Sequence, residues 1–170
     1  MTMRRHTPRT ACTRQAGAAA VELALLFLPI SVLAFGSTDM ARAMQQYNTV
    51  AKATRDAARY LTYAPGNIDA ARCLAITGSP TMSGAACSGT ALLPGLTLAQ
   101  VYACDESLDG VDTRCANHKL QTYGTVGTAN SGTVHLVSVT ITGYTFTSAV
   151  PFAAPTFTFG NVRSTMSKKI

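Results

Sequence analysis

The chain has 170 residues, a mass of 17.8 kDa and a formal net charge of +6. This length allows one small domain beyond any membrane segment and excludes a multidomain protein. Four arginines and no acidic residue lie in the first 17 residues, so the rest has ten basic against eight acidic residues and a net charge near +2. No Lys/Arg cluster interleaved with aromatic residues follows, which argues against a nucleic-acid-binding protein.

A membrane-length apolar run follows the basic leader. Residues 17–36 read GAAAVELALLFLPISVLAFG and contain a single charged residue, Glu22. About 20 apolar residues suffice to cross the hydrocarbon core of a bilayer. The leader's positive charge predicts a cytoplasmic N-terminus, with the C-terminal part on the other side of the membrane.

Glu22 is the fifth residue after the Gly17–Ala18 bond. A basic leader, a glycine, four residues, a glutamate and a hydrophobic helix resemble the start of type IV prepilins. This resemblance implies that a prepilin peptidase cuts after Gly17 and leaves Ala18 with a free amine. Because Ala18 and Glu22 are four residues apart on a helix, the carboxylate can meet this amine or that of a neighbouring subunit. Such pairing offsets an insertion cost of about 2.5–3.5 kcal/mol for a charge at the bilayer centre.

A general secretory signal is the alternative for this segment. Ala34 and Gly36 supply the small residues for cleavage before Ser37, which would release a soluble protein. The apolar run is, however, longer than the ~7–15 residues of a signal-peptide core. Glu22 would also have no role in a discarded peptide. We therefore favour the prepilin scheme.

The helix is predicted to continue beyond the membrane to about Tyr63, where Pro65 and Gly66 stop it. Pro29 predicts a kink or a loosened turn within the apolar run. Beyond the membrane, a heptad-like stripe predicts the packing face, and its members are Met40, Met44, Tyr47, Ala51, Thr54, Ala58 and Leu61.

The segment GAAAVELALLFLPISVLAFGSTDMARAMQQYNTVAKATRDAARYLTY, residues 17–63, resembles the N-terminal region of TadE-like minor pseudopilins of tight-adherence (Tad, Flp-type) pilus systems. The marks are the Gly-x-x-x-x-Glu start, the proline-containing helix, Arg42 at the membrane's outer boundary and ATRDAARY at residues 53–60. The C-terminal VSVTITGYTFTSAVPFAAPTFTFGNVRSTMS is also similar to that family. Leu23 and the chain's length argue against a major pilin subunit.

Four cysteines remain if Cys12 leaves with the leader: Cys73, Cys87, Cys104 and Cys115. Four cysteines permit three pairings, and sequence alone leaves all three open. We favour Cys73 with Cys87 and Cys104 with Cys115, since each pair closes a loop that contains turn residues. Zinc is disfavoured because no pair has C-x-x-C spacing, and an oxidising compartment favours disulfides.

Near the C-terminus, Val137, Val139 and Ile141 alternate with polar residues, which predicts a half-buried strand. Further strands around Pro151 and Pro155 predict an antiparallel meander over the distal half of the helix. The predicted fold class is α+β, with five segments: a leader (1–17), a transmembrane helix (18–36), an amphipathic continuation (37–63), a Cys-containing loop-rich region (64–130) and a C-terminal β region (131–170).

No catalytic motif is present, so we expect a non-enzymatic protein without a cofactor or metal. His118 and His135 are predicted to be surface residues. Asp105, Ser107 and Asp109 match the opening of a calcium loop, with Asp112 following, but the twelfth position is Ala116 rather than glutamate. An acidic disulfide loop is the favoured interpretation there.

These features predict a minor pseudopilin of the bacterial inner membrane, single-pass, that takes part in the assembly of Flp/Tad pili for adherence and biofilm formation. The expected partners are a prepilin peptidase, other pilin or pseudopilin subunits and the Tad secretion platform. Two alternatives are kept. One is a stationary membrane-anchored periplasmic protein, and the other is a secreted disulfide-containing adhesion domain cut after Gly36.

Overall fold

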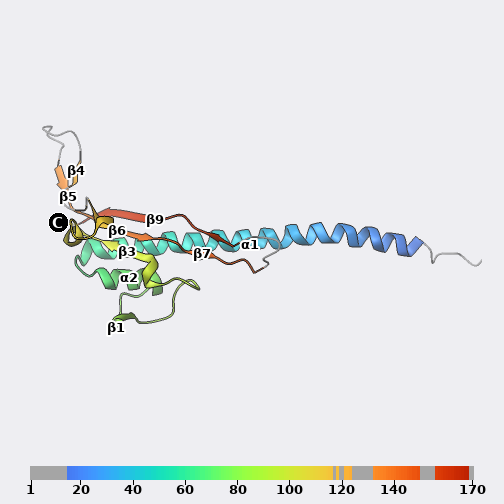
Figure 1. The fold of residues 1–170 in the computed structure, drawn as a ribbon, viewed down its shortest axis with the longest axis horizontal. Coiled ribbons are helices and arrows are strands. Elements are labelled where there is room, and N and C mark those ends of the chain that lie inside the picture. The colour runs from blue at the N-terminus through green and yellow to red at the C-terminus, as the bar shows by residue number, and fades with distance from the viewer. Residues whose placement is uncertain (1–14, 117, 119–120, 124–131, 150–155, 169–170) are drawn as a thin grey trace, which may run out of the picture.

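The structure is a computed structural model that describes residues 15–116, 118, 121–123, 132–149 and 156–168. One helix, α1 (Gln15–Tyr63), runs most of the length of the molecule, and the remaining elements gather on its distal half (Figure 1). It continues through Pro29 and ends where Pro65 and Gly66 follow, with Gly66 at φ 83°. The predicted end of the helix is therefore confirmed, while its start lies three residues before Ala18.

A second, shorter helix, α2 (Ile68–Thr77), lies against α1 in the region that was expected to be loop-rich. It ends at Gly78, which adopts φ 76° and donates its backbone N–H to the carbonyl of Leu74, a left-handed cap that glycine tolerates best. Ala71 and Ala75 bury their small side chains completely. Short side chains on this face allow the two helices to approach closely.

Three antiparallel strands form the main sheet, in the order β3 (Val101–Cys104), β6 (Leu136–Ile141) and β9 (Val162–Ser167). Val101, Ile141 and Val162 are opposite one another across the strands and are all buried. Alternate residues face the helices because successive side chains of a strand point to opposite faces. The predicted burial of Val137, Val139 and Ile141 is confirmed.

Shorter pairs of strands flank this sheet. They are β1 (Met82–Ser83) with β2 (Ala86–Cys87), β4 (Gln121–Tyr123) with β5 (Gly132–Val134), and β7 (Thr145–Phe146) with β8 (Phe157–Thr158). Single 3₁₀ turns lie at Leu98–Gln100, Glu106–Leu108 and Thr113–Cys115. The predicted α+β class is confirmed, and α2, which was not predicted, packs with α1 on one face of the small antiparallel sheet.

The packing face of α1 differs from the predicted stripe in its first half. Thr54, Ala58 and Leu61 are buried as expected, but Met40 and Met44 remain 60% and 53% exposed. The buried positions in their place are Asp39, Ala43 and Val50. The physical reason is that a straight helix repeats every 3.6 residues, so a strict seven-residue stripe drifts around it. Ser148, which follows β7, hydrogen-bonds to Asp39 on the buried side of α1.

Candidate assembly and membrane site

The predicted processing site lies in the first turns of α1. The helix begins at Gln15, so Gly17 and Ala18 belong to the first turn and Glu22 follows one turn after Ala18. The first four N–H groups of a helix have no partner within it. A Cβ atom added at Gly17 would meet no atom within 4 Å. The fold itself therefore does not require glycine at this position. The basic leader residues 1–14, with Cys12, lie outside the described residues.

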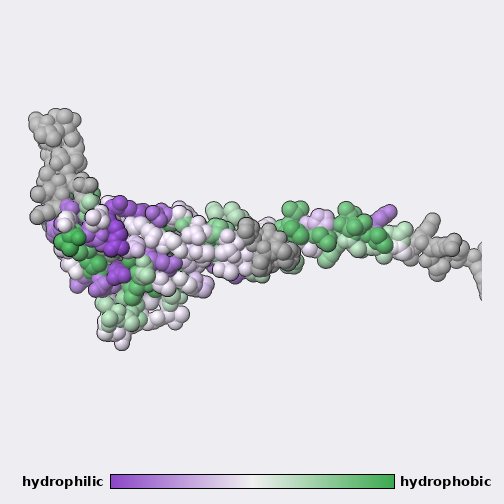
Figure 2. All heavy atoms as spheres, in the orientation of Figure 1, coloured by the Kyte–Doolittle hydropathy of each residue, from purple (hydrophilic) through white to green (hydrophobic). Residues whose placement is uncertain are grey.

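The apolar part of α1 has no protein partner among the described residues. An 18-residue window in the helix is apolar enough and long enough to cross a membrane, and none of that window is buried. Nine of its large apolar side chains are 50–74% exposed: Val21, Leu23, Leu25, Leu26, Phe27, Leu28, Ile30, Leu33 and Phe35. Figure 2 shows this segment as a largely green rod that projects from the more polar distal domain. This helix is consistent with membrane anchoring.

Arg42 lies six residues beyond Gly36 and is held by a buried carboxylate. Its Nη1 atom is 3.3 Å from Oδ1 of Asp39, whose side chain is 3% exposed, while the Arg42 side chain is 53% exposed. The hydroxyl of Ser148 also donates to Asp39. The segment around Ser148 is therefore attached to α1 immediately after the apolar segment.

The two predicted disulfide pairings are the ones present. Cys73 is joined to Cys87 and Cys104 to Cys115, with Cα–Cα distances of 5.1 Å and 5.3 Å. The first ties α2 to β2, and the second closes the acidic loop onto β3. Both lie in the region without a predicted pattern, which explains how that region holds a defined structure with few strands.

The calcium-like loop uses its carboxylates within the protein. Asp105 is buried and accepts hydrogen bonds from the backbone N–H of Gly66 at 2.8 Å and of Ser107 at 2.9 Å. Burial opposes ionisation, but these bonds and that from the Ser107 hydroxyl outweigh it and lower the pKa of Asp105. Asp112 bonds to Arg114, which lowers its pKa to about 2. Within the described part of the chain, no three metal-ligating side chains gather.

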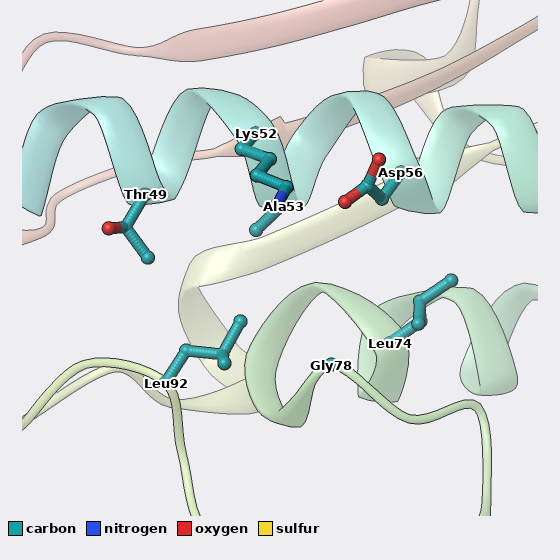
Figure 3. Close-up of a pocket in the computed structure, with 7 residues that line it drawn as sticks. All are labelled: Thr49, Lys52, Ala53, Asp56, Leu74, Gly78 and Leu92. Carbon is teal, nitrogen blue, oxygen red and sulfur yellow. The ribbon is translucent and has the colours of Figure 1, made fainter.

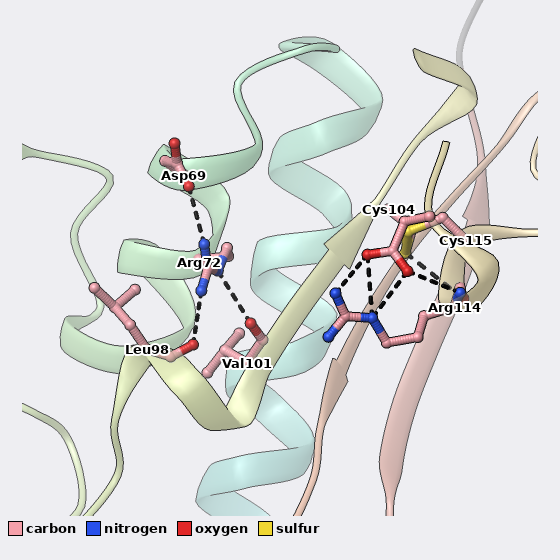
Figure 4. Close-up of polar contacts among 8 residues, drawn as sticks. Asp69, Arg72, Leu98, Val101, Cys104, Arg114 and Cys115 are labelled. Carbon is pink, nitrogen blue, oxygen red and sulfur yellow. Dashed lines mark hydrogen bonds and ion pairs between the residues drawn. A yellow bond between two sulfur atoms is a disulfide. The ribbon is translucent and has the colours of Figure 1, made fainter. Parts of the chain in front are cut away.

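Two further arginines, Arg72 near α2 and Arg114 in the loop, have partners within the domain (Figure 4). Arg72 donates to the carbonyl groups of Leu98 and Val101, at 2.8 Å and 3.0 Å, and so ties α2 to β3. Arg114 pairs with Asp112 and lies 4.2 Å from the centre of the Tyr102 ring. Both arginines stabilise the domain, and neither marks a catalytic group.

Sequence reasoning was wrong about His118, which is 1% exposed rather than on the surface. Its Nε2 atom is 2.6 Å from the hydroxyl of Ser138, and its Nδ1 atom is 2.7 Å from the carbonyl of Cys115. Ser138 is also buried, because His118 covers it, although it lies on the sheet face that was expected to be solvated. No pattern in the sequence signals this pair, because the Cys104–Cys115 loop brings His118 over the sheet. His135 is partly exposed and lies against Glu106.

A groove of about 390 Å³ separates α1 from α2 (Figure 3). Thr49, Lys52 and Asp56 line it from α1, while Leu74 and Leu92 line the opposite side. Of the residues that line the groove, only Lys52 and Asp56 are charged, and their charges are opposite. The lining residues do not form a pair of catalytic side chains. The groove therefore offers packing surface and no evident chemistry.

Comparison with known protein families decides the relationship of the long helix. The model of the TadE-like protein family matches residues 17–59. These residues form a TadE-like domain. The TadE-like domain begins at Gly17, contains Glu22 and Arg42, and ends within the packed half of α1. Neither the curated proteins nor the solved structures contain a match to the chain.

The match shows a TadE-like domain at residues 17–59. The match covers the apolar helix and its continuation, the same part that carried the sequence resemblance. The disulfide-containing part and the sheet lie outside it.

Proposed function

We propose that this protein is a minor pseudopilin that a prepilin peptidase cuts after Gly17 and that takes part in assembling Tad pili for surface attachment and biofilm formation. The observation that carries the proposal is the position of Glu22, an exposed carboxylate one turn after Ala18 on an apolar helix that no part of the described domain covers. The TadE-like match over the same residues supports it.

Cleavage would give the carboxylate a partner. Once the leader is removed, Ala18 carries a free ammonium group, and the i, i+4 spacing brings this group and Glu22 to one helix face. In a low-dielectric layer an ion pair costs less than either isolated charge. The pair can form within one chain or between neighbouring subunits, and the second arrangement would link insertion of a subunit to the presence of its neighbour.

The segment order suits a subunit held in the inner membrane with its disulfide-containing domain in the periplasm. The segments are a leader (1–17), a transmembrane helix (18–36), an amphipathic continuation (37–63), a disulfide-containing region (64–130) and a C-terminal β region (131–170). Arg42 would lie at the outer boundary of the membrane. Disulfides persist in the oxidising periplasm, which fits this orientation. The proposed partners are the prepilin peptidase, other pilin subunits and the Tad secretion platform.

The first test is the mass of the mature chain from membranes of its own host, with and without the prepilin peptidase. A start at Ala18 that depends on the peptidase is expected. A start at Ser37 would make the protein a secreted domain, and an uncut chain would leave a stationary membrane anchor.

Two substitutions separate processing from assembly. Because a Cβ atom at position 17 has open space, Gly17→Ala should leave the fold intact while cleavage is lost. Glu22→Ala should leave cleavage intact and reduce the amount of pili that shearing releases from the cells. Leu26→Ala, a control four residues later on the same exposed helix, should change neither. Normal piliation with Glu22→Ala would contradict the proposed contact.

A further inference from the structure

The outer face of the main sheet, which points away from the helices, carries polar side chains that line a groove. Tyr102 of β3 is opposite Thr140 of β6, and Thr140 is opposite Arg163 of β9. Residues directly opposite each other point to the same face of a sheet, so these three side chains form one row. The groove along this row has a volume of about 420 Å³ and is called here the outer groove. Its polar and aromatic lining residues are Tyr102, Arg114, Thr140, Thr142, Asn161 and Arg163.

Arg163 is an exposed cation without an acidic partner in the described part of the chain. All eight Asp and Glu residues of the sequence are among the described residues, and none of them forms a salt bridge with it. Its Nη2 atom lies 3.3 Å from Nε2 of His118 and 3.3 Å from the hydroxyl of Ser138, and neither group carries a negative charge. The remaining N–H donors of the guanidinium have no hydrogen-bond partner among the described residues, so they are available to a ligand.

Arg114 is the second cation of the outer groove, and it is already paired. Its Nε and Nη2 atoms donate to Asp112, and its guanidinium lies 4.2 Å from the centre of the Tyr102 ring. The described residues that line the groove include no acidic side chain. Asp112 therefore offsets one of the two guanidinium charges, and Arg163 leaves the groove with one net positive charge. A single anionic group on a ligand would complement this charge.

The side chains around Arg163 suit a ligand that carries hydroxyl groups beside its anionic group. The planar guanidinium of an arginine matches a carboxylate in a bidentate manner. The hydroxyls of Thr140 and Thr142 and the amide of Asn161 can each donate and accept hydrogen bonds, as the hydroxyls of a sugar require. The volume of about 420 Å³ lies within the range of about 300–1,000 Å³ that is typical of small-molecule sites.

A nucleic acid fits the outer groove less well than an acidic sugar. Binding to a phosphate backbone depends on several cations along a track, whereas the groove offers one guanidinium without an acidic partner. Single-stranded nucleic acids also stack their bases on exposed aromatic rings. The ring of Tyr102, however, has the Arg114 guanidinium over it. Charge and lining therefore both favour a sugar with one carboxylate.

We propose that the outer groove binds a uronic-acid residue of an acidic polysaccharide, with the carboxylate on Arg163 and the sugar hydroxyls on Thr140, Thr142 and Asn161. The groove lies outside residues 17–59, so the proposal depends neither on the proposed cleavage nor on the role of Glu22. Binding of this kind would give the distal domain its own contact with a polysaccharide-coated surface or with the matrix of a biofilm.

Calorimetric titration of the purified full-length chain in detergent tests the proposal. The probe is trigalacturonic acid, and its fully methyl-esterified form is the uncharged control ligand. Arg163→Gln removes the cation without an acidic partner. Arg59→Gln is the matched control, because Arg59 is an exposed arginine of α1 and its loss changes the net charge equally. Asn161→Ala is a second variant that leaves the contacts of Arg163 with His118 and Ser138 in place, and far-UV circular dichroism verifies the fold of each variant.

We expect the acid to bind the native chain at one site and the methyl ester to give no measurable binding. Arg163→Gln should weaken binding about tenfold or more, because charge-assisted hydrogen bonds to the carboxylate are lost. Asn161→Ala should weaken it about two- to fivefold through the loss of a neutral hydrogen bond. Arg59→Gln should change it less than about twofold, because salt screens a distant surface charge.

Three outcomes would overturn the proposal. Absence of binding, or equal binding of the acid and its methyl ester, would mean that the groove recognises no carboxylate. Equal losses in Arg163→Gln and Arg59→Gln would mean that the acid responds to net charge alone and that no site exists. Tighter binding of a single-stranded thymidine oligonucleotide, lost in Arg163→Gln, would assign the groove to nucleic acid instead. None of these outcomes bears on cleavage after Gly17, which the mass of the mature chain tests separately.

Discussion

The two halves of α1 contrast in the size and exposure of their apolar side chains. From Val21 to Phe35 the large apolar residues are exposed except Val32, which is partly exposed, whereas from Ala43 onward four of the seven buried α1 residues are alanine and the others are Val50, Thr54 and Leu61. Burying a large apolar side chain contributes about 1.5–3 kcal/mol relative to leaving it in water. The first half therefore needs lipid or other helices around it. In the second half, small side chains let α2 and the sheet come close to the helix axis.

Substituting one leucine in each half should give the largest difference. Leu61 is fully buried and Leu33 is 74% exposed. Leu61→Ala should lower the free energy of unfolding of the distal domain by about 2–5 kcal/mol, because it removes contacts and leaves a cavity. Leu33→Ala should leave that free energy nearly unchanged. Denaturant unfolding of the full chain in detergent, followed by far-UV circular dichroism, checks both. Equal losses would mean that the two halves unfold as one unit.

Removing a disulfide should have the next largest effect. The double variant Cys73→Ala/Cys87→Ala frees a segment with a sequence separation of 14 residues. Loop-closure arguments give a loss of about 3 kcal/mol in the free energy of unfolding. The loss should be confined to the distal domain, so the helicity of the apolar half should persist through the transition. Unchanged melting of the variant, or of the reduced native protein, would contradict a stabilising role.

Asp105 should give a pH-dependent effect in the distal domain. Its pKa is lowered from an ordinary value of 3.8, so its contribution is complete above that value and is lost as pH falls through the folded pKa. Asp105→Asn should lower the free energy of unfolding at pH 7 by about 1–3 kcal/mol, since the amide cannot replace all accepted bonds. Between pH 7 and pH 3 the variant should lose less stability than the native protein. Parallel curves for the two proteins would count against the assignment.

Tyr144 offers the smallest effect, where the two halves meet. Its hydroxyl donates to Gln46, and burial raises its pKa. Tyr144→Phe should lower the free energy of unfolding by about 0.5–1.5 kcal/mol, because one hydrogen bond is lost while the ring remains. Hydrogen exchange of the β7 amides should become faster near α1. Thr145→Val, on the neighbouring exposed position, is the control and should leave exchange near Gln46 unchanged.

Much of this architecture could be predicted from local patterns. The long helix and its end at Tyr63, the β6 strand and the two disulfide pairs follow from hydrophobic runs, helix-breaking residues and short loop closures. The α2 helix was missed because its ten residues lie in a region rich in small residues, where periodicity is weak. The functional expectations for Gly17, Ala18 and Glu22 stay predictions, and the family match over residues 17–59 supports them.

The sequence by itself determined the apolar helix, its lone carboxylate and the TadE-like character, because each depends on residues close together in the chain. Tertiary structure decided which side of α1 is buried, since a helix can present any of its faces until the sheet packs on one. It also placed His118 over Ser138 and attached Asp105 to Gly66, contacts that join residues 20 and 39 positions apart. Such contacts form only after the chain has folded back on itself, and no local spacing records them.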